Sequence, residues 1–173
     1  MKPARGTYPD YYHPFIEQLP DLPLTELFLV NADEVIRQFS KVEPAMENYA
    51  YAEGKWTVKQ LLGHIIDTER ILAYRALRFA RFDPQRPLSF DENEFARHSD
   101  VRHRSIADML EEFNLLRSST RSLYKSFTEP MLQQSGETAA GPISVNCLGY
   151  VMCGHAHHHT AILRRYTEAF HNT

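Results

Sequence analysis

Apolar residues recur every three to four positions in four long stretches of the chain, and this spacing predicts four amphipathic helices. The predicted helices span residues 23–42, 57–82, 105–130 and 144–170. No stretch shows the alternation of apolar and polar residues that is typical of a half-buried strand. Because four such helices bury their apolar faces by packing together, the sequence predicts an all-α fold, a four-helix bundle.

Polar residues and prolines mark the ends of these helices. Thr57 is a good N-cap residue for the second helix, and Ser105 with Asp108 resembles a capping box in which Asp replaces Glu. Pro44 follows the first helix, and Pro130 is expected to close the third. The end signals therefore agree with the lengths that the apolar pattern predicts.

The connection between the second and third helices is unusually long. It runs from Asp83 to Arg104 and is rich in Pro, Asp, Asn and Arg. Connections of this length are uncommon in compact domains and usually have a function. We expect this one either to cross between parallel helices or to cover a site. The Leu132–Ile143 stretch is expected to be a second loop, and residues 1–22 an N-terminal arm that packs on the bundle.

Four of the nine histidines lie within five positions of the last predicted helix, in the segment Gly154-His155-Ala156-His157-His158-His159. His155 and His159 are one helical turn apart, so they share the apolar face of that helix. His157 falls on the opposite, solvated side, and His158 falls at the edge, as a supporting or interface group. Buried imidazoles need partners, and one shared metal ion would satisfy both. The alternative is an exposed histidine run without an ion.

Composition and charge narrow the class of protein. The 173 residues are expected to form a single domain, 1–173, and 43% hydrophobic residues with a net charge of −3 are typical of a globular protein. Basic residues are scattered apart from a short stretch at 70–86, so we expect no nucleic-acid partner. We expect no membrane association and a cytoplasmic location, since the sequence contains neither a signal-peptide pattern nor a membrane-spanning apolar run.

The two cysteines are expected to be small core residues. Cys147 and Cys153 are six positions apart on the last predicted helix. At that spacing they point about 120° apart, so a disulfide between them is not expected.

Two longer segments carry a resemblance to a known family. Lys55–Arg70, with the sequence KWTVKQLLGHIIDTER, resembles the second-helix signature of the DinB-like superfamily. Gly154-His155 followed by His158-His159 matches the motif of its last helix. Shorter matches in the same order are Tyr11-Tyr12, Tyr74–Leu77 and Phe90–Asn93, so the resemblance extends over nearly the whole chain. The superfamily includes the YfiT-type metal-dependent hydrolases and the bacillithiol and mycothiol thiol-transferases.

The resemblance implies a bundle of DinB/YfiT type that binds one divalent metal ion through His64, His155 and His159. Three imidazoles suit Zn²⁺ and would also accept Ni²⁺. Three protein ligands leave a position open, as in catalytic sites. The implied activity is metal-dependent hydrolysis or thiol S-transfer, with the ion activating water or a low-molecular-weight thiol for reaction with a small-molecule substrate.

The residues around this implied site leave alternatives open. Asp67, three positions after His64, is expected either to orient an imidazole or act as a base, or to pair with Arg70 or Arg75. Relatives often carry Glu where this chain has Ala156, and that difference removes one proton-transferring group.

The sequence also leaves undecided which residues line the mouth of the site and whether the protein is an enzyme. Glu69, Arg75, Tyr11 or Tyr12 could line the mouth of the site. The alternatives to an enzyme are a non-catalytic metal-binding or stress-related bundle that acts as a binding module, and a helical interaction protein without metal. A homodimer is compatible with an enzyme, with a binding module and with an interaction protein.

Overall fold

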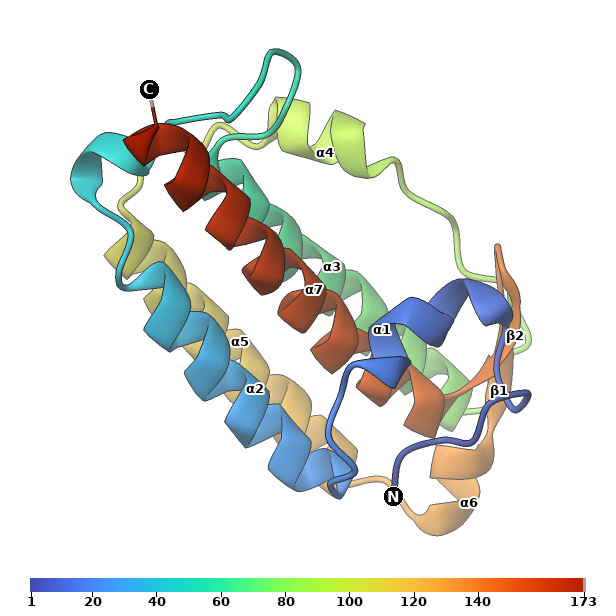
Figure 1. The fold of residues 1–173 in the computed structure, drawn as a ribbon. Coiled ribbons are helices and arrows are strands. Elements are labelled where there is room, and N and C mark those ends of the chain that lie inside the picture. Colours follow the sequence, from blue (N-terminus) through green and yellow to red (C-terminus); the bar gives the residue numbers. More distant parts are fainter. Residues whose placement is uncertain (173) are drawn as a thin grey trace.

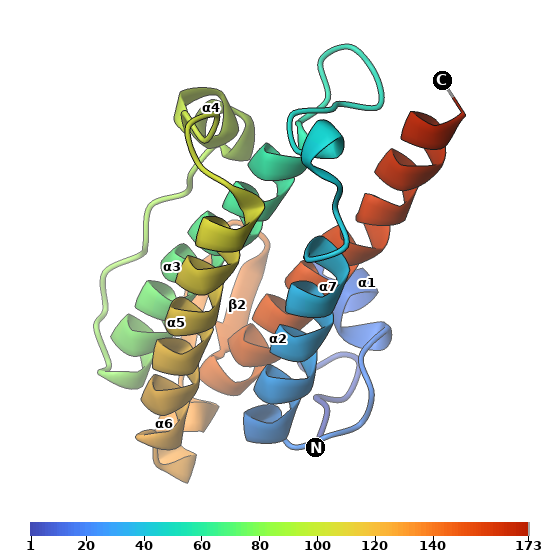
Figure 2. The same cartoon turned by 90° about the vertical axis from the view of Figure 1, so that its left-hand side faces the viewer.

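The computed structural model describes residues 1–172, and four long helices form its body (Figure 1). They are α2 (Leu24–Phe39), α3 (Val58–Ala80), α5 (Ile106–Lys125) and α7 (Val145–His171). Both α5 and α7 pack against α2 and α3, so α2 and α3 lie at opposite corners of the bundle (Figure 2). The predicted all-α four-helix bundle is confirmed. None of the described helices is both long enough and apolar enough to cross a membrane.

The helix directions explain the long connection. α3 and α5 run the same way and α2 and α7 run the other way (Figure 1). The chain leaving α3 must therefore return along the full length of the bundle before α5 begins, so the segment is a crossover between parallel helices. It contains a short helix that the sequence pattern did not predict, α4 (Glu92–His98), which packs on α3.

Side-chain caps begin the long helices at the predicted places. Thr57 Oγ1 accepts a hydrogen bond from the Gln60 N–H at 3.2 Å, and Gln60 Oε1 accepts one from the Thr57 N–H at 2.9 Å. This reciprocal pair is a complete capping box. Ser105 and Ser144 each accept a hydrogen bond from the backbone N–H three residues later, which satisfies one free donor at the start of α5 and of α7.

The end of the third long helix differs from the prediction. α5 ends at Lys125, and Pro130 lies in the first turn of a separate short helix, α6 (Glu129–Gln133). Proline is well suited to that position because the first turn needs no N–H from it. Pro130 therefore begins a new helix instead of closing α5.

The stretch predicted as a second loop contains a hairpin. Strands β1 (Ser135–Thr138) and β2 (Gly141–Ser144) pair antiparallel. Four-residue strands are too short to show a convincing alternation of apolar and polar residues, which is why the pattern missed them. The strand β2 leads directly into α7.

The N-terminal arm lies across α7. It contains a 3₁₀ turn, η1 (Asp10–Tyr12), and the helix α1 (His13–Glu17), while a second 3₁₀ turn, η2 (Pro44–Met46), lies between α2 and α3. α1 packs directly on α7 (Figure 1). Gly154 permits this approach, since a Cβ there would lie 2.2 Å from the carbonyl oxygen of Phe15.

A buried polar cluster joins all four long helices at the centre of the bundle. Arg117 of α5 and Glu69 of α3 are 2% and 3% exposed, and the Arg117 Nε lies 2.9 Å from both carboxylate oxygens. Arg117 Nη1 also donates to Asn31 of α2 at 2.7 Å and lies 3.8 Å from the sulfur of Cys153 of α7. Glu69 thus belongs to the core, and its expected place at the mouth of a site is wrong. Both cysteines, including Cys147, are free and buried, as predicted.

Replacing Arg117 with Met should lower the free energy of unfolding by about 3–5 kcal/mol, because the Glu69 carboxylate would stay buried without its partner. Chemical denaturation followed by circular dichroism measures the change. Arg164→Met is the matched control, since Arg164 pairs with Glu168 on the surface and is 84% exposed. Equal losses in the two variants would show that the buried pair is not a main source of stability.

Candidate metal centre

Three histidines from two helices meet between α3 and α7. His64 lies in the second turn of α3, and His155 and His159 lie one turn apart on α7. Their ligand-capable nitrogens are all within 4.8 Å of one another, and the Nε2 atoms of His64 and His155 are 2.9 Å apart. The three ring centroids are separated by 4.4 to 4.7 Å. The structure therefore brings together the three side chains that the resemblance implied as ligands.

Aromatic side chains cover the cluster. The ring of Trp56 lies 4.6 Å from that of His64 and 6.2 Å from that of His159, measured between centroids. The Tyr166 hydroxyl donates to the Trp56 carbonyl at 2.9 Å, which ties Trp56 to α7. On the other side Phe15 of α1 lies 5.9 Å from His155. These rings exclude water from the sides of the cluster.

Burial keeps the three imidazoles neutral. It lowers the pKa of His64 to about 4 and that of His159 to about 3, and the neighbouring histidines add to the effect at His159. Burial also holds the pKa of His155 well below its ordinary value. A neutral imidazole has the lone pair that metal binding requires. The arrangement could hold a metal ion.

One nitrogen of the three histidines bears on whether the cluster can bind a metal ion. His159 Nδ1 is buried and has no hydrogen-bond partner within the described part of the chain. Other buried atoms in the core, such as Asn31 Nδ2, are also unpaired, so the fit depends on His159 being unpaired within a group of three imidazoles. Three neutral nitrogen donors suit a divalent transition metal such as Zn²⁺ or Ni²⁺. The residues present therefore fit the implied ion.

One carboxylate approaches the cluster from the crossover. Glu92 Oε2, at the start of α4, lies 3.9 Å from His64 Nε2, and the Glu92 side chain is 57% exposed. The segment Phe90–Asn93 was part of the family resemblance, yet nothing in the sequence assigned Glu92 a role. Its approach to α3 depends on the path of the crossover, which no local pattern encodes. Glu92 is the candidate functional residue that sequence reasoning missed.

Asp67 lies on another side of α3. Its carboxylate is 3.9 Å from Arg70 Nη1, and with Gly63 and Glu112 it lines a hollow of about 210 Å³ between α3 and α5. Burial raises the pKa of Asp67. No described contact joins Asp67 to the three histidines, and it is not part of their cluster. The structure shows the second of the two expected arrangements, in which Asp67 pairs with Arg70.

The other histidines of the last helix have separate partners. His157 Nδ1 lies 3.0 Å from both carboxylate oxygens of Glu34 on α2, and this hydrogen bond raises the pKa of His157. His157 is on the far side of α7, as predicted, but it is paired instead of freely solvated. His158 stays partly exposed and meets Phe15 edge-on, with ring centroids 5.5 Å apart.

The other residues expected at the mouth of the site are two tyrosines of the N-terminal arm and Arg75 of α3. Tyr11 is 68% exposed and lies edge-on to Phe15, with ring centroids 6.4 Å apart. The hydroxyl of Tyr12 turns away to the hairpin and donates to Thr138 at 3.1 Å. Arg75 donates to the Leu88 carbonyl of the crossover at 2.8 Å. Of the two arm tyrosines, Tyr11 is the one that packs on Phe15, the residue beside His155.

Comparison with known proteins connects this site to a family. The sequence model of the DinB superfamily matches residues 32–163, a range that contains all three histidines. Among solved structures, the chain is similar to YfiT from Bacillus subtilis, described as a probable metal-dependent hydrolase with an unusual four-helix bundle topology. The two are 14% identical with a TM-score of 0.76, and the match covers 97% of this chain and 92% of YfiT.

Two further solved structures have the same architecture. A mycothiol-dependent maleylpyruvate isomerase is 17% identical with a TM-score of 0.66, and the match covers 82% of this chain but 60% of the isomerase. The DinB-like protein YjoA from Bacillus subtilis is 15% identical with a TM-score of 0.60, covering 87% of this chain and 93% of YjoA. No curated protein sequence matches the chain. At these identities the similarity establishes the fold, a DinB-type four-helix bundle.

The metal-free protein should lose stability as the pH falls below about 6.5. There the unfolded chain protonates His64 and His159, whereas the folded chain, with pKa values of about 4 and about 3, does not. Each histidine then lowers the free energy of unfolding by about 1.4 kcal/mol per pH unit. Urea denaturation between pH 7 and pH 4.5, with a chelator present, measures the slope.

The double variant His64→Gln/His159→Gln provides the comparison for this profile, since it removes both titrating groups. Its stability should depend less on pH over the same range. Parallel profiles for the variant and the wild type would show that the two imidazoles are not held neutral in the folded protein.

Proposed function

The chain belongs to the DinB superfamily, and on that basis we propose that it is a metal-dependent enzyme in which His64, His155 and His159 bind one divalent ion. The observation that carries the proposal is the convergence of three neutral imidazole nitrogens within 4.8 Å of one another. Zn²⁺ fits this donor set best, and Ni²⁺ fits it as well.

The number of protein ligands favours a catalytic site over a structural one. Structural zinc sites usually have four protein ligands, whereas catalytic sites have three and leave one position for water or substrate. Within the described part of the chain, no fourth His, Cys, Asp or Glu side chain joins the cluster. This argues for an enzyme and against a metal that only stabilises a binding module.

The surrounding residues prepare the site for chemistry. When bound, a divalent ion here acts as a Lewis acid that polarises a substrate oxygen or lowers the pKa of a water or a thiol. Trp56 and Phe15 keep bulk water from the sides of the cluster, which strengthens electrostatic interactions inside it. The neutral histidines bring no competing positive charge.

Two reaction classes fit such a site, hydrolysis of a small molecule and transfer of a low-molecular-weight thiol. The similarity to YfiT, described as a probable metal-dependent hydrolase, supports the first. The similarity to a mycothiol-dependent isomerase supports the second. In both classes the ion would meet a protic nucleophile, water or thiol, at the open side of the three histidines.

Substituting His64, His155 or His159 with Ala should remove most of the bound metal. Elemental analysis of untagged, purified protein should find about one equivalent of divalent metal in the wild type, the stoichiometry of a single three-ligand site. His157→Ala is the matched control, because His157 lies on the same helix but pairs with Glu34. Loss of metal from His157→Ala, but not from His155→Ala, would contradict the assignment.

Activity should follow metal content. Metal-loaded and chelator-treated protein would be compared on a panel of amides and esters, and on transfer of 2-mercaptoethanol to 1-chloro-2,4-dinitrobenzene. Activity should disappear with the metal and return when Zn²⁺ or Ni²⁺ is added. The melting temperature should also fall on chelation, since an ion that binds only the folded state stabilises it. A reaction that survives in His155→Ala would rule out this site as its origin.

A further inference from the structure

The crossover is fastened to α3 on both sides of Glu92. Before Glu92, Arg75 Nη2 donates to the Leu88 carbonyl at 2.8 Å. After it, Gln60 Nε2 donates to the Ala96 carbonyl at 3.0 Å, and Ala96 is 5% exposed. Both bonds run from a side chain of α3 to the backbone of the crossover. The segment that carries Glu92 is therefore held over α3 by its main chain.

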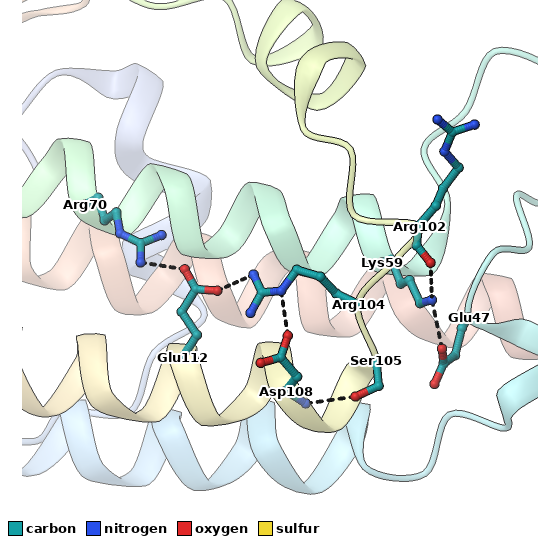
Figure 3. Close-up of polar contacts among 8 residues, drawn as sticks. All are labelled: Glu47, Lys59, Arg70, Arg102, Arg104, Ser105, Asp108 and Glu112. Carbon is teal, nitrogen blue, oxygen red and sulfur yellow. Dashed lines mark hydrogen bonds and ion pairs between the residues drawn. The ribbon is translucent and has the colours of Figure 1, made fainter.

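Ionic contacts secure the end of the crossover (Figure 3). Lys59 of α3 is 4% exposed and its Nζ lies 3.4 Å from the Arg102 carbonyl. Arg104 and Arg70 both pair with Glu112, so one carboxylate joins the crossover, α3 and α5. A segment with this many fixed contacts keeps its side chains in place, which is what a functional site requires of its scaffold.

The N-cap of α4 orients Glu92 itself. The Asp91 side chain accepts hydrogen bonds from the backbone N–H groups of Asn93 and Glu94 at 2.9 and 3.1 Å. Glu92 is consequently the first residue of a capped helix, directed towards His64. Its neighbour Glu94 pairs with Arg97 on the same short helix and is exposed.

The opposite rim of the site is the N-terminal arm. Burial, and to a lesser degree the charge of Glu92, raise the pKa of Tyr11. Tyr11 lies edge-on to Phe15, which in turn lies beside His155, so the arm approaches the cluster from the side of α7.

We propose that Glu92 accepts a hydrogen bond from an O–H or N–H group of the water or small molecule that enters the open side of the three histidines. Its carboxylate is 3.9 Å from His64 Nε2, too far for a direct hydrogen bond, and it is outside the group of nitrogens that could share an ion. An ionised carboxylate only accepts hydrogen bonds, so its partner must be a donor. This role rests on the proposed metal-dependent function and adds a contact to the substrate.

The test uses Co²⁺-loaded protein and two probes that bind as anions, 2-mercaptoethanol, which keeps an O–H donor when its thiol binds as a thiolate, and azide, which has no donor. Absorption titrations would give both affinities for the wild type, Glu92→Gln and Glu94→Gln. Glu92→Gln should keep its Co²⁺ and bind 2-mercaptoethanol about tenfold more weakly relative to azide, because a hydrogen bond from the O–H group to a charged carboxylate is lost. It should bind azide at least as tightly, since a negative charge beside the site is removed.

The matched variant Glu94→Gln should behave as the wild type towards both probes, because Glu94 faces Arg97. Thiol affinity that is unchanged relative to azide in Glu92→Gln would overturn the role of Glu92 and leave the metal site intact. Loss of Co²⁺ from Glu92→Gln would overturn it too, since Glu92 would then be a metal ligand. Failure of the wild type to bind Co²⁺ would overturn the proposed function, and the inference with it.

A second variant tests whether the fastening of α4 matters. Gln60→Glu keeps the oxygen that accepts from the Thr57 N–H but removes the donor to the Ala96 carbonyl. It should speed amide hydrogen exchange across α4 while α3 stays protected, and it should weaken thiol binding in the same direction as Glu92→Gln. Faster exchange in α4 with unchanged thiol affinity would contradict a positioned Glu92.

Discussion

The packing of α7 against α3 is the contact on which the rest of the structure depends. The two helices are far apart in the chain, yet their contact brings His64 within 2.9 Å of His155. α7 also contacts α1 and α2, so it is the helix around which the arm and half of the bundle are arranged. Gly154 allows α1 to reach α7 at the same level, which places Phe15 beside the histidines. Fold and candidate site thus share one interface.

The core contains two polar clusters that differ in how their charges and hydrogen bonds are satisfied. Around Arg117 and Glu69 the opposite charges neutralise each other inside the protein. Around His64, His155 and His159 no protein group does the equivalent, and a buried nitrogen is left unpaired. The first arrangement balances its charges within the protein, although Asn31 Nδ2 beside it is also left without a hydrogen-bond partner. The second gathers three neutral imidazoles and no opposite charge, which is the physical reason to regard it as a candidate site.

Helical spacing predicted the four long helices and also the pairing of His155 with His159, because both depend on residues close in sequence. The apolar residues around His64 predicted its burial, but one buried histidine on a helix does not specify what it faces, and the family resemblance was needed to place it in the ligand set. Spacing also left Asp67 between two roles, and the structure pairs it with Arg70, three residues further along the same helix. The hairpin was missed because its four-residue strands are too short to show an alternating pattern. Glu92 was missed because its approach to His64 depends on a tertiary contact, which no local pattern encodes.

The long sequence separation between the histidines has a consequence for biosynthesis. During translation α3, with His64, leaves the ribosome well before α7, and the chain between them must cross the whole bundle. Two of the three imidazoles belong to the last helix, so a nascent chain ending before α7 has only one of them. Contacts this distant in sequence form late in folding. Capture of the proposed metal ion would therefore follow the docking of α7, and it would report that the bundle has assembled.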